Sequence, residues 1–378
     1  MKLNAKVAVA LMALSSIGCA SGAYISNTVS KTDSPVKTQT QSYGSSTRVV
    51  ADFNGDAILD MLISTTQGLV ARLGKNDNTY RKDTLIYRVD ASSGMAPGDI
   101  TTWFNPETAK QMTFFSLPTE VSQWSVDGKK KFSKETLGIP MDNEQLTLTD
   151  RVNNTILEDG NNVWGITASK NSIYSYNLYN EKIAKKKKDD KYDYVQQKLL
   201  LSVEQRIGPN EKPIAPDIAA GYFSKDGLLG IAVLQPDTIY FLNMKSSSQD
   251  SLVLNYEKGI SLDPLKEIVT NDSIDENSLK IFSITTKDGD RDNLLVGYGS
   301  YLLDFKFDSA ENRYLCEKFY KMPLQKTSAK LNYNINTRKN ANGNIFVNVY
   351  PETGEMIGYI YTEGGLKENF NRSKNNSK

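Results

Sequence analysis

The amino-acid sequence predicts an all-β fold built from one unit that is repeated along the chain. Short runs of apolar, β-branched and aromatic residues alternate with turns of Gly, Asn and Asp, as in short antiparallel strands. The runs recur at intervals of 51, 52, 67, 62 and 52 residues and are centred on Leu62, Thr113, Gly165, Ala232, Leu294 and Phe346. A single small sheet cannot bury both of its faces, so such units become stable when they pack around an axis. The sequence therefore predicts a β-propeller, most simply with six blades, and leaves seven open.

The boundaries of this propeller are expected near residues 46 and 370. We expect each recurring apolar run to form an inner strand of its blade. Two intervals are longer than the rest because residues 180–193, with four consecutive lysines, resemble a solvated hairpin insertion, and residues 262–277 form a polar connection. The alternatives are a β-sandwich or two unrelated β-domains.

A nine-residue loop with regularly spaced oxygen side chains precedes the first apolar run. Such side chains occupy its positions 1, 3, 5 and 9, and Gly55 allows a tight turn, which is what a Ca²⁺ ion requires from a short loop. The loop lacks the glutamate and the flanking helices of an EF-hand. The alternative is an Asx-type turn that binds no metal. The candidate calcium ligands are Asp52, Asn54, Asp56, Asp60 and, at position 7, the backbone carbonyl of Ile58.

The segment Asp52-Phe53-Asn54-Gly55-Asp56, followed by a further Asp and an apolar strand, resembles the FG-GAP or VCBS-type repeat of integrin-like calcium-loop propellers. The resemblance is strong over residues 49–66, fair over 219–234 and 286–296, and elsewhere depends on spacing. It implies a propeller with a structural calcium loop. Ala57 stands where the family mostly has Gly, so a positive φ there would strain the loop by about 1 kcal/mol.

The other repeats have lost most of the ligand set. In the second repeat, Trp103 and Gln111 replace two of the four ligands, so we expect no ion there. The loop at 222–230 keeps only Asp226, and any site at 284–292 would be partial. The sixth repeat carries Asn336, Arg338, Asn340 and Asn344 at the loop positions.

The first 19 residues have the order of a secretory signal peptide: two lysines, a short apolar run and small residues. Gly18-Cys19 resembles a bacterial lipoprotein processing site, which implies lipidation of Cys19, although Ser16 departs from that pattern. Cleavage near Ala20 or Gly22 would instead release a soluble protein. Residues 20–45 are expected to form a flexible tether and 371–378 a disordered tail. The chain is thus expected in the cell envelope (outer membrane or periplasm) as a lipoprotein, or secreted, with no transmembrane helix in the mature form.

The sequence contains no histidine, which removes the usual general base and the commonest zinc ligand. The formal net charge of +1 does not favour nucleic acid as a partner. After removal of the signal peptide, Cys316 would be the only free thiol of the chain, so we expect no intramolecular disulfide. We expect Cys316 itself to be a buried strand residue. We therefore expect a binding or adhesion module for a protein or glycan partner rather than an enzyme. The alternatives are a scaffold propeller that docks on a membrane complex, and a polysaccharide lyase or glycosidase.

Overall fold

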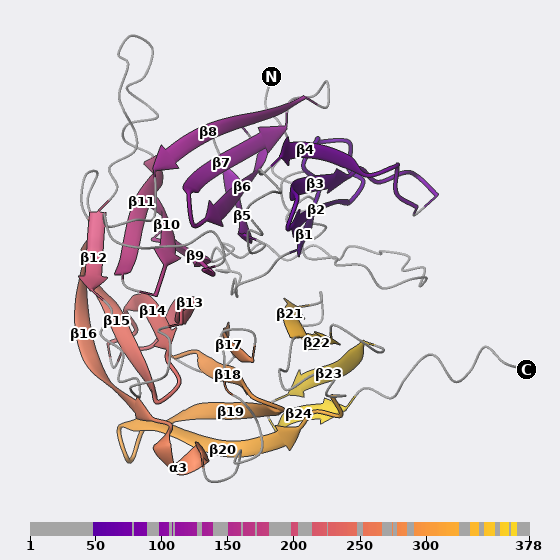
Figure 1. Ribbon diagram of the computed structural model, residues 1–378. Helices are drawn as coiled ribbons and strands as arrows, with labels where there is room; N and C mark the ends of the chain where they lie inside the picture. Colours follow the sequence, from indigo (N-terminus) through magenta and orange to yellow (C-terminus); the bar gives the residue numbers. More distant parts are fainter. Residues whose placement is uncertain are drawn as a thin grey trace, which may run out of the picture.

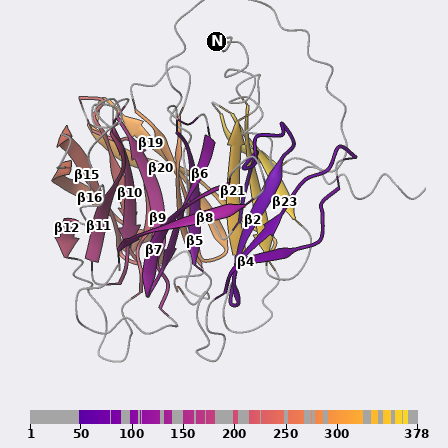
Figure 2. The same ribbon diagram turned by 90° about the horizontal axis from the view of Figure 1, so that it is seen from above.

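The chain folds into six four-stranded antiparallel sheets arranged around a common axis as a six-bladed β-propeller (Figures 1 and 2). This computed structural model describes part of the chain between residues 48 and 368. The described residues are 48–77, 79–88, 98–105, 108, 110–126, 131–138, 150–159, 162–170, 172–180, 198–202, 214–224, 226–247, 252–266, 274, 278–285, 291–324, 333–339, 344–351, 356–362 and 364–368. Cys19, the expected tether and tail, and the lysine-rich insertion lie outside them.

The first three blades follow one another along the chain. Blade one contains β1 (Arg48–Ala51), β2 (Asp60–Thr65), β3 (Gly68–Arg72) and β4 (Thr84–Arg88). Blade two contains β5 (Asp99–Asn105), β6 (Lys110–Leu117), β7 (Glu120–Val126) and β8 (Phe132–Gly138). Blade three contains β9 (Asn153–Glu158), β10 (Asn162–Ala168), β11 (Ser172–Asn180) and β12 (Lys198–Ser202).

The other three blades continue in the same way. Blade four contains β13 (Asp217–Tyr222), β14 (Leu229–Leu234), β15 (Thr238–Ser247) and β16 (Leu252–Ser261). Blade five contains β17 (Leu279–Ile284), β18 (Asn293–Tyr298), β19 (Tyr301–Asp308) and β20 (Arg313–Lys321). Blade six contains β21 (Tyr333–Lys339), β22 (Ile345–Pro351), β23 (Ile357–Thr362) and β24 (Gly365–Glu368). One short helix, α3 (Asp263–Lys266), follows blade four. No helix in the described part of the chain is long and apolar enough to cross a membrane.

The strand nearest the axis is the first strand of each blade, as Figure 1 shows for β1, β5, β9, β13, β17 and β21. The expectation that the recurring apolar runs form the inner strands was wrong by one position, because these runs are the second strands. The second strand has a hydrogen-bonded neighbour on each edge, and in blades such as three and four it is buried on both faces. It therefore carries the longest apolar run, and its pattern is more visible in the sequence than that of the axial strand.

The core consists of apolar clusters that are each shared by two neighbouring blades. Between blades four and five, for example, Leu234 and Ile281 are fully buried in one such cluster. Near the axis, side chains also join adjacent blades. The Asp99 carboxylate of β5 accepts a hydrogen bond of 2.6 Å from the backbone N–H of Asn154 on β9. Apolar packing therefore holds neighbouring blades together, and buried polar contacts near the axis help to fix how adjacent axial strands are aligned.

Candidate metal-binding loop

The loop at residues 52–60 connects β1 to β2 in blade one, and a cross-strand pair between Ala51 and Asp60 closes it. Phe53 points into the core and is buried, which anchors the loop to the interface of blades one and two. The connection after β3 packs against the loop at Gly74. A Cβ at Gly74 would lie 2.3 Å from the carbonyl oxygen of Leu59, so only glycine permits this approach.

Asp52 organises the first half of the loop through its carboxylate. One oxygen, Oδ1, accepts the N–H of Gly55 at 2.8 Å, and the other, Oδ2, accepts the N–H of Ala57 at 2.8 Å. Asn54 Oδ1 accepts the N–H of Asp56 at 2.9 Å, and Asp56 Oδ1 accepts that of Ile58 at 3.0 Å. The loop is therefore a series of Asx turns in which side-chain oxygens satisfy the backbone N–H groups.

Asp60 closes the loop from a fully buried position. Its Oδ1 accepts the N–H of Gly74 at 2.8 Å, and its Oδ2 accepts that of Phe53 at 3.2 Å. The pKa of Asp60 is raised to about 6, chiefly by burial; the carboxylates of Asp56 and Asp52 also act to raise it, whereas the two N–H donors act to lower it. Asp60 thus links three segments of blade one and concentrates negative charge beneath the loop.

The backbone of the loop enters the left-handed region twice, at Gly55 with φ of +75° and at Ala57 with φ of +64°. A residue with a Cβ has a strain of about 1 kcal/mol in this region. Position 6 thus has the positive φ under which strain was expected, and alanine occupies a position that suits glycine.

The loop fits a calcium ion in the chemistry of its donors, with three carboxylates, one amide oxygen and a carbonyl. Each carboxylate oxygen that accepts one N–H still has a second lone pair for a cation. However, in the described part of the chain no three acidic, cysteine or histidine side chains converge on one point. The side-chain nitrogen of Asn54 is buried without a hydrogen-bond partner. The donors are thus present in the loop but are not gathered around a single centre.

In blade four, the described residues of the β13–β14 connection resemble this loop, but of the four side-chain ligands only Asp226 remains. Gly221 pairs with Gly230 as Ala51 pairs with Asp60, and Gly227, at position 6, also has φ of +64°. At position 3, Ser224 Oγ accepts the N–H of Leu228 at 2.7 Å. The alignment of the fourth repeat with the first is therefore confirmed in the backbone.

In blades two and six, the described loop positions lie largely within paired strands. In blade two the pairing of β5 with β6 continues to Asn105 and Lys110, and Trp103 is buried in the core between blades two and three. In blade six, β21 pairs with β22 through Lys339 and Ile345, which places Asn336 and Arg338 within a strand. Asn344 is exposed just before β22, and Asn340 lies outside the described residues.

In blade five, Asp292 at position 9 serves the neighbouring blade. Its Oδ2 accepts the backbone N–H of Tyr222 in blade four at 3.1 Å and the hydroxyl of Ser283 at 2.6 Å. Blade four lacks a carboxylate at its own position 9, where Gly230 stands. Blade five therefore supplies, from across the interface, a carboxylate to position 1 of the blade four loop, whereas in blade one Asp60 accepts the N–H at position 2 of its own loop. Sequence reasoning missed this role, because the residues are 70 positions apart.

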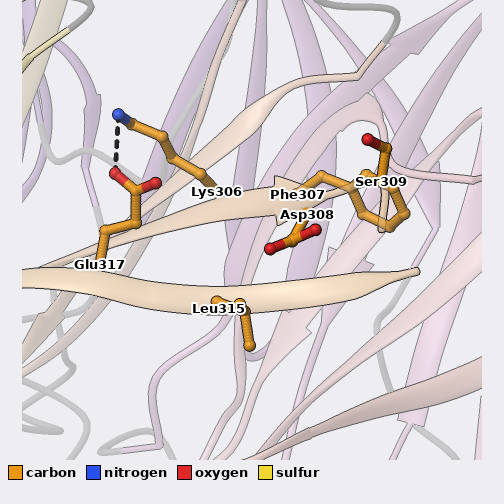
Figure 3. A pocket seen from close by; sticks show the side chains of 6 residues that line it. All are labelled: Lys306, Phe307, Asp308, Ser309, Leu315 and Glu317. Carbon is orange, nitrogen blue, oxygen red and sulfur yellow. Dashed lines mark ion pairs between the residues drawn. The ribbon is translucent and has the colours of Figure 1, made fainter. Parts of the chain in front are cut away.

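A shallow pocket of about 280 Å³ lies at the hairpin of β19 and β20 (Figure 3). Lys306 and Glu317 form an ion pair of 2.8 Å on one side of it, and Phe307 and Leu315 contribute apolar walls. Nothing in the sequence singles out this site, since strand residues line it and no motif marks it. Cys316 lies on a strand, β20, as expected, but is half-buried rather than buried, and this burial raises the pKa of its thiol to about 11.

Comparisons with known proteins show likeness of fold and not of sequence. No family profile matches the chain, and no curated protein matches it. A solved structure of a protein from Lactobacillus plantarum is 13% identical, covers 87% of this chain and 82% of its own, and has a TM-score of 0.49. A functionally unknown protein from Desulfotomaculum acetoxidans is 13% identical, with coverages of 86% and 84% and a TM-score of 0.44. A lectin from Aleuria aurantia, in complex with Fucα1-6GlcNAc, is 11% identical, with coverages of 82% and 91% and a TM-score of 0.44. At these levels, the likeness carries no information about function.

Proposed function

We propose that this protein is an exported propeller that binds a protein or glycan partner, and that a structural calcium ion stabilises blade one. The fold supports a binding or scaffold module in general terms, because a propeller presents loops and blade edges on a rigid ring. The finer proposal is carried by the loop at 52–60. It keeps every calcium-type donor, although Ala57 strains its backbone.

The calcium ligands in this proposal are Asp52, Asn54, Asp56, the Ile58 carbonyl and Asp60. Bound calcium would supply positive charge among carboxylates that otherwise repel one another, and it would hold the β1–β2 connection in one conformation. In blade four, the turn at position 6 has the same φ with Gly227 and with a single exposed carboxylate, Asp226. This turn therefore does not by itself require the full set of oxygen side chains that blade one keeps.

The test compares Asp56→Ala with the matched control Asp226→Ala, since both carboxylates are exposed at position 5 of equivalent loops. In calcium, Asp56→Ala is expected to lower the melting temperature, because it removes a ligand. In EDTA it is expected to have little effect. Asp226→Ala should have little effect in either buffer. Equal losses for Asp56→Ala with and without calcium would contradict the calcium site.

Export and anchoring are tested independently by the intact mass of the protein purified from its native host. A mature chain that begins at Cys19 with an added lipid mass supports the anchored form. Cleavage near Ala20 or Gly22 without lipid supports the secreted form. Retention of residues 1–19 would contradict export.

A further inference from the structure

The interface between blades six and one differs from the other interfaces of the ring. Each apolar cluster formed by the described residues joins two consecutive blades, from one and two through to five and six. None of these clusters joins blade six to blade one, although the two blades are neighbours in the ring in both views (Figures 1 and 2). We call the two facing surfaces of blades six and one the seam.

Burial of the second strands shows the same difference. In blades three and four, every residue of β10 and β14 is buried, because a blade packs on each face. In blade six, β22 buries Val347 and Val349 against blade five, whereas Phe346, on the opposite face of the strand, is only half-buried. The alternation shows that one face of this sheet is packed and the other is not.

The two faces of the seam are nevertheless apolar. On blade six, Phe346 pairs across the strands with Ile360, and both are half-buried. On blade one, Ile63 pairs with Val70, and Val70 pairs with Leu85, which is 37% exposed. Contiguous apolar side chains that are left partly exposed on two facing sheets indicate a surface that another segment covers.

We propose that residues 20–47 of this chain cover the seam and pack between blades six and one. This segment continues directly into Arg48, which begins β1 and pairs with Ile63 in the apolar row of the seam. Its extended length of about 90 Å is sufficient to run along both blades. Because it is tethered at the seam, its effective concentration there exceeds that of any free partner.

The composition of the segment suits a narrow, half-covered face. Most of the segment is polar, with many Ser and Thr residues between its larger apolar residues. These are Tyr24 and the adjacent Ile25, Val29, Val36 and Tyr43. Blade six already has four strands of its own, so the segment is not needed as a missing strand of that sheet. It would act instead as an apolar filling between two complete blades. The proposal does not depend on calcium or on the identity of a partner.

The first test measures tryptic cleavage after Lys37, which lies in the segment, by mass spectrometry of the full mature chain. Cleavage in the folded protein is expected to be at least about tenfold slower than in a synthetic peptide of residues 20–47. Phe346→Ser on the seam should accelerate it several-fold. Tyr256→Ser is the matched control, because Tyr256 is 65% exposed on the outer strand β16 away from the seam, and it should not change the rate.

A second variant, Val70→Ser on the blade one side of the seam, keeps the test valid if Phe346→Ser does not fold. Val70→Ser should also accelerate cleavage after Lys37. A rate in the wild-type protein equal to that of the free peptide would overturn the proposal. So would equal acceleration by Phe346→Ser and Tyr256→Ser. Protection that grows over an about hundredfold range of protein concentration would show that a second copy covers the seam, which also overturns it.

The second test is hydrogen exchange in a variant that lacks residues 20–45. Amides of β2 and β22 are expected to exchange faster than in the full mature chain, while those of β10 and β14 stay unchanged. Unchanged exchange in β2 and β22 would overturn the proposal. Faster exchange in all four strands would indicate general destabilisation and would also count against it.

Discussion

The loops at residues 52–60 and 222–230 connect equivalent strands of blades one and four, and position 6 of both has φ of +64°. Blade four meets this requirement with Gly227 and has glycine in place of the closing carboxylate. Blade one uses Ala57 and keeps all of its oxygen side chains. The comparison teaches that the left-handed turn at position 6 forms in blade four without the acidic side chains that accept the backbone N–H groups in blade one.

The largest effect is expected for Asp60→Ala. Asp60 is buried and accepts the N–H groups of Phe53 and Gly74, so the substitution leaves two buried donors unsatisfied. We expect a loss of about 3 kcal/mol in the free energy of unfolding, measured by urea denaturation. Asp83→Ala, which removes an exposed ion pair with Arg72 in the same blade, should change little. Similar losses for the two variants would contradict the view that the buried Asp60 carboxylate stabilises the fold more than an exposed ion pair does.

Asp292→Ala tests whether blade four depends on a carboxylate from blade five. The variant removes an acceptor from the backbone N–H of Tyr222 and from the Ser283 hydroxyl. A loss of about 2 kcal/mol in the free energy of unfolding is expected, with faster hydrogen exchange at Tyr222. Exchange at Phe53 in blade one should not change, because Asp60 serves that loop. Equal acceleration in the two blades would break the comparison.

The pH dependence of stability should also distinguish the two loops. The folded-state pKa of Asp60 is raised to about 6, above its value in an unfolded chain, so folded Asp60 holds a proton that the unfolded chain releases. This contribution is fully present below about pH 4 and is lost as the pH rises through about 6. Without calcium, we expect stability to fall by about 2 kcal/mol over this interval in urea titrations. The fall should be smaller by this amount in Asp60→Ala, and identical pH profiles would contradict the assignment.

The smallest effects are expected at position 6, where the two loops should respond with opposite sign. Ala57→Gly relieves the left-handed strain and should raise the free energy of unfolding by up to about 1 kcal/mol. Gly227→Ala introduces the same strain and should lower it by about 1 kcal/mol. Thermal melts in EDTA measure both. Changes of the same sign would show that the two loops are not equivalent.

Much of the fold was predictable because it follows from local patterns. The spacing of the apolar runs predicted six blades, and the six sheets confirm this number. The spacing could not show which strand lies nearest the axis, because axial strands such as β9, with Asn153 and Asn154, are partly polar and give a weaker apolar pattern. Which strand of a blade faces the axis depends on how the neighbouring blades pack around it, and the sequence of a single repeat does not contain that information.

The candidate site divides in the same way. The sequence by itself identified residues 52–60 as a turn rich in oxygen side chains and marked Ala57 as the position where a positive φ would cause strain, because Asx turns and backbone strain involve neighbouring residues. Tertiary structure alone decided that Gly74 contacts the loop, that Asp292 serves blade four, and that the seam of blades six and one is less covered than the other interfaces. These properties arise from contacts between segments far apart in the sequence, and only the closing of the ring determines which segments meet.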